Sequence, residues 1–240
     1  MLRLAELWPS TPIVYANIAV TGLTANSREV QQGDVFVALQ GLRHDARQFI
    51  PQALEQGAVA VLCQDVVGVQ DLNGIPIIAI PELPSLLGEI AARFYQQPSQ
   101  SFAVVAVTGT NGKTSSAQML AHACQYLGVK SAVLGTLGNG IVGEIQPSSH
   151  TTLEAISLQK KLAGFRDEKV QMVAMEASSH GLEQGRLNAT AIDTAIFTNL
   201  TRDHLDYHGS MASYQQAKAL LFQWSTLKNA IFNADDAVSA

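Results

Sequence analysis

The stretch that most constrains the fold is residues 104–127. Its first part, 104–107, is a Val-rich apolar run that predicts a buried strand. Its last part, 114–127, carries apolar residues three and four positions apart, which predicts a helix ending at Gly128. Between them the chain reads Thr-Gly-Thr-Asn-Gly-Lys-Thr. A glycine-containing turn from a buried strand into a helix favours an α/β protein built on a parallel sheet.

This turn predicts a site for a nucleotide phosphate. Backbone N–H groups and the helix N-terminus would face the anion, Lys113 adds a positive charge, and the Thr114 hydroxyl can ligate Mg²⁺. The loop is shorter than the standard phosphate loop, because Val107 stands where that motif has its first glycine. The alternative is an ordinary strand-to-helix turn that contains Gly and Lys, but the flanking pattern favours the phosphate site. The candidate residues are Gly109, Thr110, Asn111, Gly112, Lys113 and Thr114.

Composition restricts the classes of partner. The net charge is −5 and the pI is near 5.6, which argues against an electrostatic nucleic-acid binder. No apolar run approaches the roughly 20 residues of a membrane helix, and the first residues do not form a signal peptide. Cys63 and Cys124 show no metal-binding spacing and are expected to be buried thiols in a reducing compartment. We therefore expect a soluble, cytoplasmic protein, and nothing in the sequence requires assembly beyond a monomer.

Alternating elements predict two units. The polar segment 96–100, which contains Pro98, is the expected linker, so the units are 1–99 and 100–240. In the first unit we predict strands at 34–39, 58–62 and 75–80, and helices at 49–56 and 83–95. The second unit should be a doubly wound parallel sheet with strands at 103–107, 131–135, 170–176, 192–197 and 229–233, and helices at 114–127, 153–163 and 211–224.

Polar residues follow the predicted strands of the second unit, where open parallel sheets bind ligands. Glu176 ends one strand and could reach a metal on the nucleotide phosphates, although a solvated acidic residue would also fit this position. The segment 203–208 holds two His and two Asp, residue types that ligate metals or transfer protons; spacing alone does not decide which of them act. Lys218 lies on a largely apolar helix, where a lysine would by default extend to the surface.

Several stretches together resemble the Mur ligase family of peptidoglycan synthesis. They occur in order along nearly the whole chain. They are Thr-Gly-Thr-Asn-Gly-Lys-Thr at 108–114, His-Thr-Thr at 150–152, Met-Glu-Ala-Ser-Ser-His-Gly-Leu at 175–182, Phe-Thr-Asn-Leu-Thr-Arg-Asp-His-Leu-Asp-Tyr-His-Gly at 197–209, Ala-Lys at 217–218 and Asn-Ala-Asp-Asp at 233–236. The stretches at 175–182 and 197–209 are most similar to the branch of the family that adds the third amino acid of the peptide.

The resemblance implies an ATP-dependent ligase that phosphorylates a carboxylate and couples the acyl phosphate to an amine. It implies an N-terminal uridine-nucleotide-binding domain followed by an ATPase domain, with Ser115 added to the nucleotide-binding residues. The catalytic residues would be Lys113, Glu176, His204 and Lys218. Thr114, Glu176 and His204 would ligate Mg²⁺, together with Lys218 if it is carbamylated to N6-carboxylysine, an oxygen-bearing anion better suited to a hard cation than an ammonium.

The resemblance also implies the substrates: ATP, UDP-N-acetylmuramoyl-L-alanyl-D-glutamate and a diamino acid, either meso-diaminopimelate or L-lysine. Residues at matching positions would hold the nucleotide-sugar peptide. They are Ser27, Arg28 and His44 in the first unit, and Thr151, Thr152, Ser178, Gln184 and Arg186 in the second. A planar guanidinium suits a carboxylate or phosphate.

Family members have a third domain that selects the amino acid, and its Asp-Asn-Pro-Arg motif does not occur in this sequence. We therefore expect a fragment with little or no ligase turnover, because closing domains complete such sites and exclude water. Two alternatives remain. One is another ligase of the same superfamily, such as a folylpolyglutamate synthase, which would not need a uridine nucleotide. The other is a non-catalytic module that binds a nucleotide sugar.

Overall fold

The protein, seen in a computed structural model that describes residues 2–41, 45–64, 68–148 and 150–239, forms two compact units. They are Met1–Gln96 and Gln97–Ala240, so the break falls within the polar segment 96–100. The turn Pro98–Ser101 belongs to the second unit, and the Ser99 hydroxyl accepts a hydrogen bond from the Ala191 N–H at 2.9 Å. Each unit contains a sheet of its own.

The described part of the first unit contains a five-stranded sheet in the order β3-β4-β5-β7-β6. Its strands are parallel except for β6, which pairs antiparallel with β7. The central strands β4 and β5 are entirely buried. The elements are β1 (Leu2–Arg3), α1 (Leu4–Leu7), β2 (Ala19–Val20), β3 (Gly22–Thr24), β4 (Asp34–Ala38), α2 (Ile50–Glu55), β5 (Ala60–Cys63), β6 (Val69–Leu72), β7 (Ile75–Ala79) and α3 (Leu83–Phe94).

The described part of the second unit contains a six-stranded sheet in the order β10-β9-β11-β8-β12-β13. All neighbours are parallel except β10 with β9. The elements are β8 (Ala103–Thr108), α4 (Lys113–Tyr126), β9 (Ser131–Gly135), β10 (Gly138–Ile141), α5 (Ala155–Asp167), β11 (Met172–Glu176), α6 (Ser179–Glu183), β12 (Thr194–Phe197), α7 (Leu205–His208), α8 (Met211–Ala219) and β13 (Asn229–Phe232). The α/β fold predicted from the sequence is confirmed.

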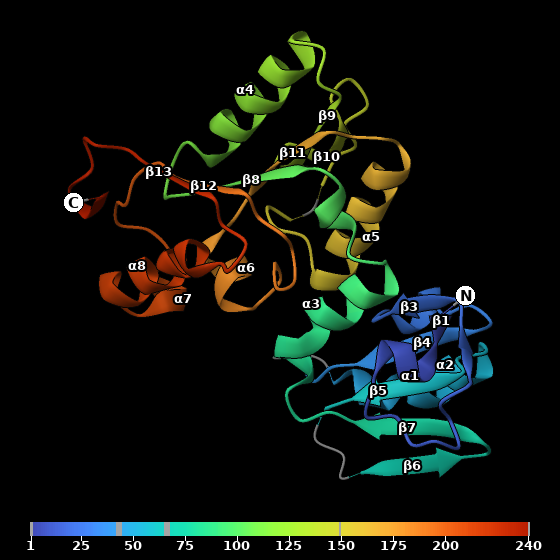
Figure 1. Ribbon diagram of the computed structural model, residues 1–240. Helices are drawn as coiled ribbons and strands as arrows, with labels where there is room; N and C mark the ends of the chain where they lie inside the picture. The colour runs from blue at the N-terminus through green and yellow to red at the C-terminus, as the bar shows by residue number, and fades with distance from the viewer. Residues whose placement is uncertain (1, 42–44, 65–67, 149, 240) are drawn as a thin grey trace. The chain divides into compact units, whose positions relative to one another are not determined.

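Helices cover both faces of this second sheet (Figure 1). Successive side chains of a strand point to opposite faces. Val107 therefore packs toward Ala117 and Ala121 of α4, whereas Ala106 packs with Leu158 on the other face. The small alanines let α4 lie close to the sheet. They are the only two buried residues of this helix, so most of its other side chains face outward.

Strand β8 lies between β11 and β12, and α4 carries the chain from β8 past β11 to β9. The chain thus leaves β8 at the point where the strand order reverses. In open parallel sheets this is where ligands bind, outside the carboxyl ends of the strands.

Three expectations need correction. The helix predicted at 211–224 ends at Ala219 and continues as the 3₁₀ turn Leu220–Gln223. The strands predicted to start at 170 and 192 begin two residues later. Cys63 is buried, which raises the pKa of its thiol to about 11, but Cys124 is only partly buried because α4 covers the sheet mainly with alanines.

Within the described residues, no helix has both the length and the apolar character needed to cross a bilayer.

Candidate functional site

The loop after β8 turns sharply into α4. Gly109 has φ +146°, a conformation that side-chain-bearing residues rarely adopt. A Cβ atom at Gly109 would lie 1.9 Å from the Thr198 hydroxyl, so no larger residue fits. The N–H groups of the first helical turn, which starts at Lys113, have no partner within the helix and are available to an anion.

The segment after β12 holds this loop in place. The Asn199 carbonyl accepts from the Thr110 N–H at 2.8 Å, and its side-chain oxygen accepts from the Asn111 N–H at 3.0 Å. The Thr198 hydroxyl donates to the Asn111 carbonyl at 2.6 Å, and the Thr201 N–H donates to the Thr110 hydroxyl at 2.9 Å. Backbone groups on both sides of the loop are thus fixed by one neighbouring segment, so the loop is preorganised.

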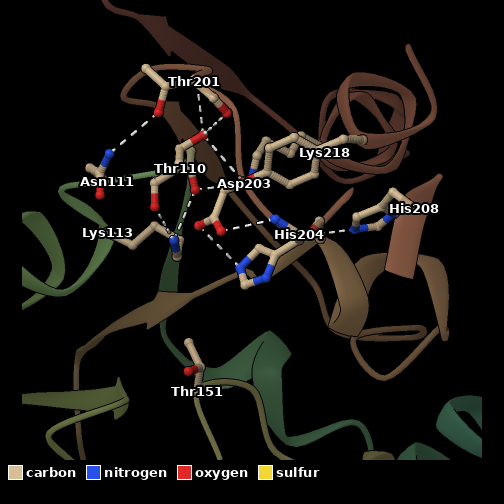
Figure 2. A network of polar contacts seen from close by, with 12 residues as sticks. Thr110, Asn111, Lys113, Thr151, Thr201, Asp203, His204, His208 and Lys218 are labelled. Atoms are coloured by element: carbon tan, nitrogen blue, oxygen red, sulfur yellow. Dashed lines mark hydrogen bonds and ion pairs between the residues drawn. The ribbon is translucent and has the colours of Figure 1, made fainter. Parts of the chain in front are cut away.

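Two lysines converge on the loop from different helices (Figure 2). The Lys113 ammonium donates to the carbonyl oxygens of Gly109 at 2.9 Å and Thr110 at 2.8 Å, and the Lys218 ammonium donates to the Gly109 carbonyl at 2.9 Å. Lys218 is only 2% exposed, so the default expectation of a surface lysine is wrong. Burial, reinforced by the charge of Lys113 and opposed by Asp203, lowers the pKa of Lys218 to about 7. Burial also lowers the pKa of Lys113, against the opposing effects of Glu176 and Asp203.

The Glu176 carboxylate lies opposite the start of α4. Its Oε2 accepts from the Thr114 hydroxyl at 2.9 Å, and its Oε1 accepts from the Thr136 N–H at 2.7 Å. Across the described residues, no three His, Cys, Asp or Glu side chains converge to form a metal cage. A hydroxyl beside a carboxylate nevertheless fits Mg²⁺, which usually takes few protein ligands and completes its shell with phosphate and water.

A second polar cluster lies beside the carboxylate. The Thr152 hydroxyl donates to the Glu176 carbonyl at 3.1 Å and lies 2.9 Å from the Ser178 hydroxyl. The Arg186 guanidinium donates to the Thr152 carbonyl at 3.0 Å and to the Gln184 side chain at 2.8 and 2.6 Å. Arg186 also pairs with Glu154 at 3.1 Å. Gln184 therefore orients Arg186, and the cluster offers hydroxyl and guanidinium donors to an anionic ligand.

Histidines border the same region. His204, at φ +52°, lies with its Nε2 3.5 Å from the Asp203 carboxylate and its ring 5.0 Å from that of His180. His208 is buried, with its Nε2 2.9 Å from the Ser179 hydroxyl and its Nδ1 3.2 Å from the Glu183 carboxylate. Burial lowers the pKa of both His180 and His208.

Many of these groups line one cavity of about 490 Å³ in the second unit. The predicted residues that line it are Thr110, Asn111, Gly112, Lys113, Thr114, Thr151, Thr152, Glu176, Ser178, Arg186, His204 and Lys218. Gly109, Ser115 and Gln184 do not line it, although Gly109 and Gln184 contact residues that do.

Three candidate residues belong to the first unit. Ser27 is buried, and its hydroxyl donates to Gln52 at 3.1 Å, whereas Arg28 is exposed. His44 lies outside the described residues. The roles assigned to these three residues stay predictions.

Four further residues line the cavity that were not selected from the sequence: Thr136, His150, Ser179 and His180. Thr136 directly follows β9, so the rule that ligands gather at the carboxyl ends of parallel strands could have found it. The other three lie inside or next to the motifs quoted above, but their types alone did not separate them from their neighbours.

Two family descriptions match the sequence. "Mur ligase middle domain" matches residues 107–240, and "Mur ligase family, catalytic domain" matches residues 19–95.

Five similar curated proteins carry the name UDP-N-acetylmuramoyl-L-alanyl-D-glutamate–2,6-diaminopimelate ligase. The one from Xylella fastidiosa is 47% identical over 98% of this chain and 47% of its own length. The one from Chromobacterium violaceum is 46% identical over 96% of this chain and 47% of its own length. The chain thus spans about half the length of the curated relatives it matches.

Solved structures agree with this result. One of a UDP-N-acetylmuramoyl-L-alanyl-D-glutamate–2,6-diaminopimelate ligase, 37% identical, superposes with a TM-score of 0.88 over 99% of this chain and 48% of that one. The MurF ligase of Thermotoga maritima in complex with ADP shares the fold at 23% identity, with a TM-score of 0.63 over 91% of this chain and 46% of that one. The matched domains, the high-coverage relatives and the fold lead to one conclusion: the chain belongs to the Mur ligase family.

Proposed function

We propose that this chain carries the nucleotide site and part of the acceptor site of an ATP-dependent ligase that attaches 2,6-diaminopimelate to UDP-N-acetylmuramoyl-L-alanyl-D-glutamate. The observation that carries the proposal is the single cavity in which a phosphate loop with Lys113 faces a separate cluster around Thr152 and Arg186. Relatives 43–47% identical that bear this name support the choice of substrates. ATP and nucleotide-linked precursors are reagents of the cytoplasm, where we place the reaction.

The loop and α4 would bind the ATP phosphates. The first-turn N–H groups of α4 and the Lys113 ammonium supply positive charge where the transferred phosphoryl group is most negative. Lys113 now donates to the Gly109 and Thr110 carbonyls, and its flexible chain would turn toward the phosphates when they bind.

Thr114 and Glu176 would hold Mg²⁺, with His204 near a second ion. When bound, the metal offsets the negative charge on the phosphate oxygens. The Thr136 N–H keeps the Glu176 carboxylate facing Thr114, so these two protein oxygens stay together without the metal.

Two chemical steps would follow. A carboxylate oxygen of the acceptor attacks the γ-phosphorus, which forms an acyl phosphate and releases ADP. The amine of the diamino acid then attacks the acyl carbon, loses a proton and expels phosphate. Lys113 would stabilise charge in the first step, whereas Arg186, Thr152 and Ser178 would orient the acceptor.

We further propose that Lys218 is carbamylated. A buried lysine with a pKa of about 7 is substantially neutral at physiological pH, so its nitrogen lone pair can form an N–C bond to CO₂ with loss of one proton. The product would carry oxygens toward the loop. Labelling with ¹³C-bicarbonate should give a carbamate carbon signal that is absent from Lys218→Ala and unchanged in the exposed control Lys228→Ala; equal signals from both variants would contradict it.

Titration calorimetry tests the function. The chain should bind Mg²⁺-ADP and, separately, UDP-N-acetylmuramoyl-L-alanyl-D-glutamate. Lys113→Met should weaken the nucleotide and spare the muramoyl peptide, whereas Arg186→Met should do the reverse. Each should shift its own dissociation constant by about tenfold or more, the typical effect of losing a charge-assisted hydrogen bond. Binding of the nucleotide without the muramoyl peptide would instead favour another ligase of the superfamily.

A further inference from the structure

Thr136 contacts the Glu176 carboxylate through two groups. Its backbone N–H donates to Oε1 at 2.7 Å, and its hydroxyl lies 3.4 Å from Oε2. That second oxygen also accepts from the Thr114 hydroxyl at 2.9 Å. Glu176 is only 2% exposed. Thr136 is therefore one of the residues whose hydrogen bonds hold this buried carboxylate against the start of α4.

The Thr136 hydroxyl has a third neighbour, the hydroxyl of Thr151, at 3.0 Å. One hydroxyl has one hydrogen to donate and lone pairs to accept with. Because a carboxylate can only accept, Thr136 donates to Glu176 and accepts from Thr151 when both contacts form. The hydroxyls then point in one direction, from Thr151 through Thr136 to Glu176.

This chain of contacts connects two halves of the cavity. Glu176 and Thr114 belong to the nucleotide half, whereas Thr151 precedes Thr152, whose contacts to Ser178 and Arg186 define the acceptor half. Among the described residues between β9 and β10, Thr136 is the one whose side chain hydrogen-bonds both to Glu176 in the nucleotide half and to Thr151 beside the acceptor half.

We propose that Thr136 is a positioning residue that couples acceptor binding to Mg²⁺-nucleotide binding. The inference rests on the proposed function, since it names how the two ligands of that site affect each other. An acceptor that orders Thr151 also orders the Thr136 hydroxyl, and through it the Glu176 carboxylate. Coupling of this kind is reciprocal, so the nucleotide strengthens acceptor binding by the same factor.

A purely structural role of the Thr136 hydroxyl predicts that its removal lowers the stability of the chain, whereas a positioning role does not. Thr136 is an exposed residue, and its backbone contact to Glu176 survives any side-chain change. Thr136→Val keeps the shape and removes only the hydroxyl, while Thr136→Ser keeps the hydroxyl. Neither variant should alter the urea midpoint of unfolding appreciably, because Thr136 is exposed and Glu176 keeps its hydrogen bonds from the Thr136 N–H and the Thr114 hydroxyl.

The test measures the dissociation constant of Mg²⁺-ADP with and without saturating UDP-N-acetylmuramoyl-L-alanyl-D-glutamate, on the whole chain. In the wild type the muramoyl peptide should tighten nucleotide binding. Thr136→Val should reduce this factor by about three- to tenfold, the range expected for one hydrogen bond, and raise the Mg²⁺ concentration needed for ADP binding by a similar factor. Thr136→Ser should restore both values.

Thr151→Val should reduce the coupling as Thr136→Val does, and the double variant should lose no more than either single variant. Thr226→Val is the matched control, because it removes a hydroxyl that bonds only the backbone of Ile192 in the same unit.

The outcomes separate the two proposals. Unchanged coupling in Thr136→Val, or a wild type that binds both ligands independently, overturns the role of Thr136 and leaves the proposed function standing. A wild type that fails to bind either ligand overturns the corresponding half of the proposed function, and the coupling with it.

Discussion

The ammonium groups of Lys113 and Lys218 both donate to the carbonyl oxygen of Gly109, each at 2.9 Å. One carbonyl oxygen can accept two hydrogen bonds, so the geometry is satisfied. Two positive charges on one oxygen nevertheless repel each other, which adds to the effect of burial in lowering the pKa of Lys218.

Stability should depend on pH through Lys218. Its pKa is about 7 in the folded chain against an ordinary value of 10.5, so between these values the unfolded chain binds more protons. The free energy of unfolding therefore gains a contribution that rises with pH above 7, by up to about 1.4 kcal/mol per pH unit. Urea unfolding of the wild type and Lys218→Met at pH 7, 8 and 9, in CO₂-free buffer, should show the difference growing with pH.

Lys228→Met provides the control for this series, because the Lys228 side chain is 72% exposed. A constant difference between wild type and Lys218→Met across the range would contradict the lowered pKa.

Gly109 should be the more sensitive of two glycines that share a positive φ. Gly109→Ala places Cβ 1.9 Å from the Thr198 hydroxyl, whereas Gly128→Ala, at φ +82°, meets no atom within 4 Å. We expect Gly128→Ala to cost about 1 kcal/mol from backbone strain alone. Gly109→Ala should cost about 2 to 4 kcal/mol, because crowding adds to strain, and should weaken Mg²⁺-ADP binding. Equal urea midpoints for the two variants would show that the loop can move away from Thr198.

Ser179 should stabilise the chain through His208. Ser179→Ala removes the partner of the buried His208 Nε2 at 2.9 Å, and an unpaired buried polar group costs about 1 to 3 kcal/mol. Ser179→Thr keeps a hydroxyl and serves as the comparison. Chemical unfolding of both variants measures the effect, and a Ser179→Ala chain as stable as the wild type would exclude it.

His208 should also make stability fall in mild acid. Its pKa is lowered from 6.5 mainly by burial, so the folded chain keeps it neutral. As pH falls below 6.5 the unfolded chain takes up a proton that the folded chain resists, and stability decreases until the folded pKa is reached. His208→Gln lacks this contribution, so its stability should approach that of the wild type between pH 7.5 and 5.5. Parallel pH curves would disprove this.

The backbone of His204 should prefer glycine over alanine. His204 is at φ +52°, where a residue with a Cβ is strained by about 1 to 2 kcal/mol. Both variants lose the ring, so His204→Gly should be more stable than His204→Ala by about 1 kcal/mol. On the exposed surface of α4, near its C-terminal end, the order reverses, and Ala123→Gly should cost up to about 1 kcal/mol. Unfolding midpoints of the three variants decide the question.

The sequence predicted the central elements because each had a strong local signal. The Val-rich run before Gly109 became β8, and the helix ended next to Gly128 as expected. β6 was not predicted, although the Asn73-Gly74 pair, both at positive φ, makes the hairpin turn to β7. That dipeptide is a strong hairpin signal and could have found it.

The arrangement of the site could be predicted only in part. Lys113, Thr114 and Glu176 follow from strand ends and motifs, and they do lie together around one cavity. Asn199 and the burial of Lys218 depend on which strands are neighbours, and no local pattern contains that information. The buried lysine contradicts the default rule because the helix that carries it packs against the loop.

The contacts between the loop and Asn199 join residues 88 positions apart in the sequence. Opening the loop would break these contacts, and the parallel pairing of β8 with β12 sits directly beneath them. The phosphate site and the sheet should therefore be lost in one cooperative event instead of by local fraying. The amide hydrogens of Thr110 and Asn111 would then exchange with solvent only as fast as the whole unit unfolds, which makes the loop a reporter of global stability.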